Sequence, residues 1–179
     1  MTDTPIRLAT GADEAELMTI CRELHEENGL FEMVEDRVRA MLRKAFNKEG
    51  GLVGVIGPPG AVEALMFLLI SNAWYSDRWH LEELFSYVRP AHRKTTHARR
   101  LVEWGKHMAD EVHLPAIIGI ISSKRTEAKV RLYQRFLGNP TGAFFLYVPP
   151  GLDIKTEGGN AKLQWGRSRD RKREATAVN

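Results

Sequence analysis

The chain of 179 residues is poor in several features that would assign it to a special class of protein. Its one cysteine, Cys21, cannot form an internal disulfide, so we expect a reducing compartment, the cytoplasm. The longest apolar run, 64–70, is far shorter than the roughly 20 residues of a membrane-spanning helix. The N-terminus lacks the basic start and apolar stretch of a signal peptide. These absences predict a protein without a membrane partner.

The sequence also lacks the common catalytic and metal-binding motifs. It contains no G-x-S-x-G elbow and no G-x-x-x-x-G-K-[ST] loop. The six histidines are scattered without the spacing of a zinc site. His92 and His97 flank a basic turn, where solvent or phosphate is the expected neighbour. The sequence therefore predicts no metal cofactor.

Positive charge is concentrated near the C-terminus. The net charge is +3, but residues 162–174 alone carry +4, which leaves −1 for the rest of the chain. We expect one domain over 1–151 and a basic, flexible tail over 152–179, because the tail has little apolar content. The tail either only aids solubility or contacts nucleic acid or another acidic partner.

Before the tail, strand and helix patterns alternate along the chain. The apolar periodicities and turn residues predict strands at 6–9, 52–56, 62–73, 79–88, 115–121 and 142–148, and helices at 10–28, 34–45, 98–112 and 125–137. This order predicts an α/β domain with one mixed central sheet of about six or seven strands, flanked by helices on both faces. We expect the dense apolar run 115–121 to be buried on both sides, and helix 125–137 to be covered on two sides.

A basic turn lies between strand 79–88 and helix 98–112. Residues 88–98 read Val-Arg-Pro-Ala-His-Arg-Lys-Thr-Thr-His-Ala. The first N–H groups of a helix have no partner inside it, and the helix dipole favours negative charge there. Arg93 and Lys94 add positive charge at the same place. The turn therefore predicts a site for a phosphate or pyrophosphate.

Two segments carry a family resemblance. Val88, Pro90, Arg93 and Ala98 fall in register on V-x-P-x-x-[RQ]-x-x-G-x-[GA], the pyrophosphate loop of the GNAT family of N-acetyltransferases, with Thr96 in place of the usual glycine. On the last helix, Leu132-Tyr133 followed by Gly138 resembles the family's L-Y-x-x-x-G-[FY] segment, with one additional residue before the glycine. Asn139 replaces the usual aromatic, and Thr126 the asparagine that often begins this segment. The element order over about 5–148 also resembles that family.

The resemblance implies an acetyl-CoA-dependent N-acyltransferase that moves an acetyl group directly to a primary amine. In such an enzyme, Arg93 would be the charged clamp on the pyrophosphate. Backbone atoms of Tyr87 and Val88 would pair with the pantetheine arm. Backbone N–H groups at the helix start would bind the pyrophosphate, from Lys94, Thr95, Thr96, His97 and Ala98.

The same resemblance assigns catalytic roles. Tyr133 would be the general acid that protonates the departing thiolate. Glu83 or Glu82 would be the general base, with Glu83 preferred, while His80 and a chain of water molecules stay open as alternatives.

Glu82 and Glu83 are neighbours on a strand, so they point to opposite faces of the sheet. Strict alternation groups Glu83 with Leu81, Phe85 and Tyr87. A bulge, which family members often carry in this strand, would break that count.

The acceptor is left open by the sequence. Trp74, Tyr75 and Trp79 make the loop 71–80 aromatic; they either bind a ring or an amine or anchor the loop on the body. The first helices carry an acidic group that suits a cationic amine, from a small molecule or a protein: Glu23, Glu26, Glu27, Glu32 and Glu35.

Three alternatives to an N-acetyltransferase remain. The chain could be a nucleic-acid-associated protein of the same fold that modifies a nucleobase or nucleoprotein or only binds, or it could bind acyl-CoA without turnover. Because family members are often dimers, the resemblance also suggests a homodimer.

Overall fold

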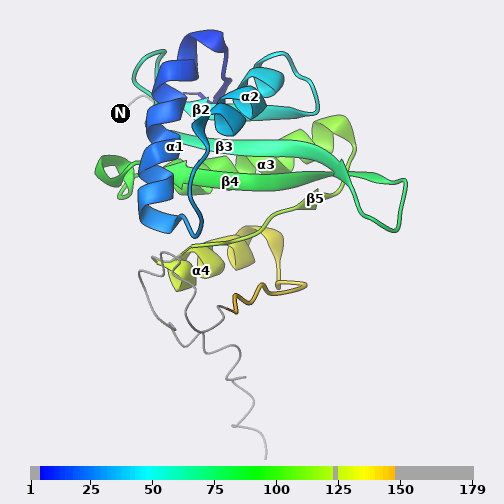
Figure 1. Cartoon of the computed structure of the whole chain (residues 1–179). Helices are drawn as coiled ribbons and strands as arrows, with labels where there is room; N and C mark the ends of the chain where they lie inside the picture. The colour runs from blue at the N-terminus through cyan, green and yellow to red at the C-terminus, as the bar shows by residue number, and fades with distance from the viewer. Residues whose placement is uncertain (1–4, 123–124, 148–179) are drawn as a thin grey trace, which may run out of the picture.

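The computed structural model describes residues 5–122 and 125–147, and within these ranges one mixed sheet forms the centre of the protein (Figure 1). Its five strands lie in chain order: β1 (Arg7–Leu8), β2 (Gly51–Ile56), β3 (Ala64–Asn72), β4 (Trp79–Val88) and β5 (Ala116–Ile117). Neighbours from β1 to β4 are antiparallel, whereas β5 is parallel to β4.

Helices cover both faces of this sheet, as the sequence predicted. Helices α1 (Glu14–Asn28) and α2 (Glu35–Phe46) pack on one face, where the core includes Leu17, Ile20, Leu42, Val53, Val55, Leu65, Phe67 and Tyr87. Helix α3 (His97–Val112) packs on the other, over Ala64, Met66, Leu68 and Leu81. Helix α4 (Thr126–Leu137) lies beside α3 at the β4–β5 side of the sheet (Figure 1).

The start of α1 is fixed by a buried carboxylate. Asp13 closes a short 3₁₀ turn, Gly11–Asp13, and is fully buried. Its Oδ2 accepts a hydrogen bond from the Thr10 N–H at 2.9 Å, and the two residues form a capping box. The Arg7 guanidinium donates to both carboxylate oxygens at 2.8 and 2.7 Å, and this pairing lowers the pKa of Asp13. Strand β1 and helix α1 are thereby held together.

A close approach sets the position of α3 on the sheet. A Cβ atom added to Gly54 of β2 would lie 2.7 Å from the indole ring of Trp104 on α3. Only glycine leaves room for the ring at this point of the strand. The absence of a side chain at Gly54 therefore helps to set the position of α3, which begins at the end of the basic turn.

Three predictions about the C-terminal part are wrong. The run 115–121 forms a strand only at Ala116–Ile117, and both residues are exposed rather than buried. Residues 142–147 form no strand, so the described sheet has five strands instead of six or seven. Helix α4 has no buried residue. These predictions rested on apolar composition, whereas a strand needs a hydrogen-bonded partner and burial needs close packing on every side.

Two further features bear on the class of protein. No helix in the described ranges is both long and apolar enough to cross a bilayer. Cys21, on α1, lies in the hydrophobic core, where burial raises the pKa of its thiol to about 11. The predicted boundary at residue 151, the tail 152–179 and Val148 lie outside the described residues.

Candidate functional site

A β-bulge in β4 decides which glutamate faces which side of the sheet. Phe67 lies opposite Phe85, but the next residue, Leu68, lies opposite Glu83, so Leu84 is an additional residue with no partner on β3. Residues opposite each other in a ladder share a face. Glu83 therefore shares the α3 face with Leu68, while Phe85 lies on the α1–α2 face. The strict alternation that grouped Glu83 with Phe85 and Tyr87 is wrong.

The bulge also separates the two candidate bases. Glu82 lies opposite Leu69, on the α1–α2 face, and is exposed. His80, two residues earlier, shares that face and is buried. Only Glu83 points to the side of α3 and α4.

The carboxylate of Glu83 lies in a buried, hydrogen-bonded site beside Lys129. Its oxygens accept hydrogen bonds from the Tyr133 hydroxyl at 3.1 and 3.3 Å. The Ser86 hydroxyl and the Gly119 N–H also stabilise the carboxylate. Burial outweighs these hydrogen bonds and raises the pKa of Glu83 to about 7. At neutral pH this group can therefore both accept and donate a proton.

Tyr133 brings α4 to β4. Its hydroxyl lies 3.1 Å from Oγ of Ser86 as well as within reach of Glu83. Burial, and next the neighbouring charge of Glu83, raise the pKa of Tyr133 far above its usual value. The phenol is therefore protonated throughout the neutral range and available as a proton donor. The structure thus unites Glu83 and Tyr133, which lie 50 residues apart in the sequence.

This pair lies where two parallel strands part. Strand β4 pairs with β5 only at Leu81–Ala116 and Glu82–Ile117. After β5 the chain leaves the direction of β4 and runs toward α4 (Figure 1). From Glu83 to Val88, the β5 side of β4 has no strand partner in the described part of the chain. Main-chain groups along this edge can pair with an extended ligand.

The basic turn offers open N–H groups at its end. A short 3₁₀ helix, Pro90–His92, precedes α3. The N–H of Thr95 donates to the His92 carbonyl at 3.1 Å, and that of His97 to Thr95 Oγ1 at 3.2 Å. Among the residues that the structure describes, the N–H groups of Lys94, Thr96 and Ala98 have no hydrogen-bond partner. These three donors lie at the start of a 16-residue helix, as an anion site requires.

Arg93 faces α1 instead of these open donors. Its Nε donates to the Val88 carbonyl at 3.0 Å, its Nη2 pairs with Glu27, and the guanidinium lies 5.4 Å from the centre of the Tyr87 ring. To reach an anion at the start of α3, the side chain has to leave Glu27. Arg89 likewise binds Glu23 and Glu16. The predicted acidic surface is therefore partly neutralised by basic residues.

The aromatic side chains of the loop 71–80 do not pack against the rest of the domain. Trp74 and Tyr75 are 95% and 75% exposed, and Trp79 is exposed as well. The rings of Trp74 and Tyr75 touch edge to face, with centroids 5.4 Å apart. The anchoring interpretation is therefore wrong, and these rings face solvent beside the β3–β4 connection.

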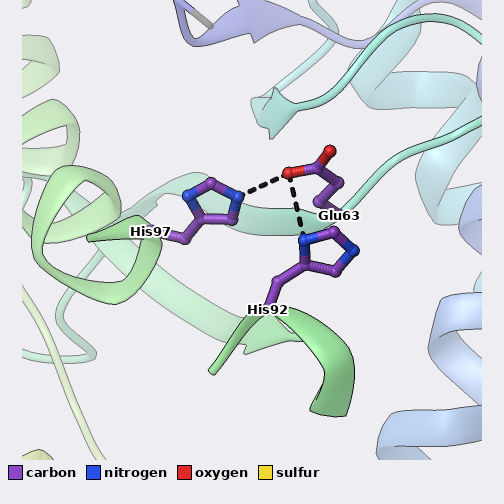
Figure 2. A group of neighbouring side chains, drawn as sticks. All are labelled: Glu63, His92 and His97. Atoms are coloured by element: carbon purple, nitrogen blue, oxygen red, sulfur yellow. Dashed lines mark hydrogen bonds and ion pairs between the residues drawn. The ribbon is translucent and has the colours of Figure 1, made fainter. Parts of the chain in front are cut away.

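One cluster was missed by the sequence analysis. Glu63, His92 and His97 converge beside the basic turn (Figure 2). Nε2 of His97 lies 2.6 Å and Nδ1 of His92 lies 3.3 Å from the same oxygen, Oε2 of Glu63. Glu63 is 34 residues from His97, too distant for any spacing motif. The antiparallel β3–β4 pairing, which brings the start of β3 to the end of β4, was the available signal.

Several proteins of known structure have a fold similar to that of this chain. No protein-family model matches the chain, and no curated protein matches it in sequence. A probable acetyltransferase of known structure is 19% identical, with a TM-score of 0.62 over 83% of this chain and 99% of its own. A possible acetyltransferase from Clostridium difficile 630 is 16% identical, with a TM-score of 0.62 over 81% and 97%.

A third similar structure contains a bound ligand. AAC(6')-Iy in complex with the bisubstrate analog CoA-S-monomethyl-acetylneamine is 12% identical, with a TM-score of 0.64 over 82% of this chain and 97% of its own. The chain spans nearly the whole length of all three proteins. These similarities confirm the fold that the GNAT resemblance implied.

Proposed function

From this GNAT fold, we propose that the protein is an acetyl-CoA-dependent N-acetyltransferase that transfers an acetyl group directly to a primary amine. The observation that carries the proposal is the hydrogen-bonded pair of Glu83 and Tyr133 at the point where β4 and β5 part. A carboxyl group with a pKa near 7 beside a protonated phenol supplies the two proton-transfer groups that this reaction needs.

The reaction removes two protons from the ammonium nitrogen, of which one is balanced by the proton placed on sulfur and the other passes to solvent. Glu83 accepts the proton of the ammonium group, directly or through water, and the neutral amine attacks the thioester carbon. The C–N bond forms and the C–S bond breaks, the nitrogen releases its second proton to water, and the Tyr133 hydroxyl gives its proton to the thiolate. Glu83 then returns its proton to the phenolate across their hydrogen bond of 3.1 Å. The pair ends in its starting state, with no net proton gained.

The cofactor would lie along the open side of β4. The pantetheine amides would pair with backbone atoms of Tyr87 and Val88, where the strand has no partner on its β5 side within the described ranges. The pyrophosphate would bind at the turn that contains Lys94, Thr95, Thr96, His97 and Ala98. Its contacts there would be the open N–H groups, joined by Arg93 once that side chain leaves Glu27.

We propose a cationic small-molecule amine as the acceptor. Aminoglycoside acetyltransferases are among the proteins of similar structure, including one in complex with sisomicin. In this chain, the exposed rings of Trp74 and Tyr75 can bind a cation through their π faces. A protein amine is the competing acceptor, since a ribosomal-protein-alanine N-acetyltransferase from Brucella melitensis biovar Abortus 2308 also has this fold.

Binding and turnover can be tested separately. Calorimetry with acetyl-CoA and CoA should show one site per chain, and uptake of neither at about millimolar concentration would contradict the whole proposal. Release of free CoA is then followed with aminoglycosides, polyamines and alanine-terminated peptides. Turnover with at least one of them supports the enzyme. Tight binding without turnover on all of them would instead identify an acyl-CoA-binding protein.

A further inference from the structure

The cluster of Glu63, His92 and His97 joins three separate segments beside the basic turn. Glu63 immediately precedes β3, His92 ends the 3₁₀ helix after β4, and His97 is the first residue of α3. Figure 2 shows the two imidazole rings on either side of one carboxylate oxygen. The rings are nearly parallel, at 11°, with centroids 5.7 Å apart.

The donor atoms have the spacing of a metal site. Nε2 of His97, Nδ1 of His92 and Oε2 of Glu63 all lie within 4.8 Å of one another. Ligands at about 2.0–2.1 Å from a tetrahedral zinc ion lie roughly 3.3 Å apart. The separation of His92 and Glu63 is already 3.3 Å, and that of His97 and Glu63 would open from 2.6 Å. Small side-chain movements therefore suffice to admit an ion.

The surroundings allow an ion to enter and stay. The side chain of His97 is 11% exposed, whereas those of His92 and Glu63 are each 33% exposed. The site is thus closed on the helix side and open to solvent on the other. Nδ1 of His97 is buried without a partner in the described part of the chain, so Glu63 is the ring's one polar contact. Replacing that contact by a metal breaks no other hydrogen bond of the ring.

We propose that Glu63, His92 and His97 bind a Zn²⁺ ion. Two imidazoles and one carboxylate are the ligands that zinc accepts, whereas calcium and magnesium prefer oxygen alone. Three protein ligands leave a fourth position for water or an anion. The carboxylate offsets one of the two charges, so the bound ion adds positive charge beside the open N–H groups of the turn.

A bound ion would hold the turn in place. Its ligands join the connection before β3, the residues after β4 and the start of α3, which are the parts that position Lys94, Thr96 and Ala98. The metal would therefore stabilise the folded protein by mass action and reduce the freedom of the proposed pyrophosphate turn. Neither consequence depends on the identity of the acceptor.

Zinc titration of tag-free, chelator-treated protein tests this site. We expect one Zn²⁺ per chain with a dissociation constant in the micromolar range or below, competed by a chromophoric chelator. Glu63→Gln and His92→Ala should each weaken binding by about tenfold or more. His107→Ala, which removes an exposed histidine elsewhere on α3, should bind zinc as the parent does.

Cobalt provides a measurement that needs no variant. Co²⁺ in a four-coordinate site of nitrogen and oxygen ligands should give the visible absorption bands of tetrahedral cobalt, which zinc then abolishes. Circular dichroism of the metal-free variants is the control that they are folded. The proposal is overturned if the parent takes up no stoichiometric zinc at about 100 µM, if all four proteins bind it equally, or if cobalt gives only octahedral bands.

Discussion

Glu83 lies directly opposite Leu68 in the β3–β4 ladder, and Leu68 is completely buried. The bulge at Leu84 thus turns a carboxylate toward the apolar α3 side of the sheet, where water cannot fully solvate its charge. Three hydrogen-bond donors compensate only in part, and the pKa of Glu83 stays near 7. The chemistry of the site therefore originates in the register of two strands.

The pH dependence of catalysis should report this carboxyl group. The carboxylate is the active base and forms above its pKa, so kcat/KM should rise with pH to a plateau, with a midpoint near 7. Glu83→Gln should lower kcat/KM at least about tenfold and remove this limb. Glu82→Gln should keep it; if Glu82→Gln instead abolishes the limb, the base is Glu82. Steady-state kinetics at saturating acetyl-CoA measure both profiles.

Tyr133→Phe should separate acid catalysis from binding. Without the hydroxyl, the thiolate leaves unprotonated, so turnover should fall at least about tenfold, while acetyl-CoA affinity by calorimetry stays nearly unchanged. Tyr147→Phe makes the same chemical change on an exposed ring and should keep the parent's turnover number. Equal turnover in Tyr133→Phe and the parent would exclude the acid role.

Tyr133→Phe should also move the pH profile. The Tyr133 hydroxyl donates to the carboxylate and lowers the pKa of Glu83. Removing it should raise the midpoint of the remaining activity above that of the parent. A midpoint that stays the same or falls would mean that the hydrogen bond does not form in solution.

The stability of the protein should depend on pH through Glu83. Its pKa is raised from 4.5 in the unfolded chain to about 7 in the folded protein, so the folded state binds more protons between these values. The free energy of unfolding should therefore fall as pH rises through this window, by at most roughly 3 kcal/mol. In urea unfolding, Glu83→Gln should be more stable than the parent at about pH 8 and lose this advantage near pH 4. A parallel pH dependence of the two proteins would contradict the raised pKa.

Packing of α3 on β2 predicts an asymmetry between two glycines. Gly54→Ala places a methyl group against the ring of Trp104 and should cost about 1–3 kcal/mol of stability. Gly11→Ala has no atom within 4 Å of the added carbon and should have little effect. Thermal or urea unfolding of the two variants measures the difference. An unaffected Gly54→Ala would show that α3 packs elsewhere.

The sequence predicted most of the fold because its signals were local. Strand β4 has the predicted bounds 79–88, and α3 begins one residue before its predicted start. The apolar pattern failed at 115–121 and 142–147, where none of the residues is buried and only Ala116–Ile117 form a strand. Periodicity measures composition along the chain, and burial depends on what packs against it.

The candidate site was predictable only in part. Tyr133 and Glu83 were assigned from the resemblance, and the structure brings them together. The face of Glu83 was not accessible by counting, because a single bulged residue inverts the alternation. The pairing of Arg93 with Glu27 and the convergence of Glu63 with His92 and His97 join residues that are distant in sequence, and only the folded chain reveals them.

The burial of Cys21 makes the protein well suited to a colorimetric assay. Aromatic disulfide reagents react with thiolates, and a buried thiol with a pKa of about 11 offers almost none near neutral pH. Since Cys21 is the chain's one sulfhydryl group, the folded protein contributes no background colour. Any absorbance that develops in the presence of acetyl-CoA and an amine therefore counts the coenzyme molecules set free.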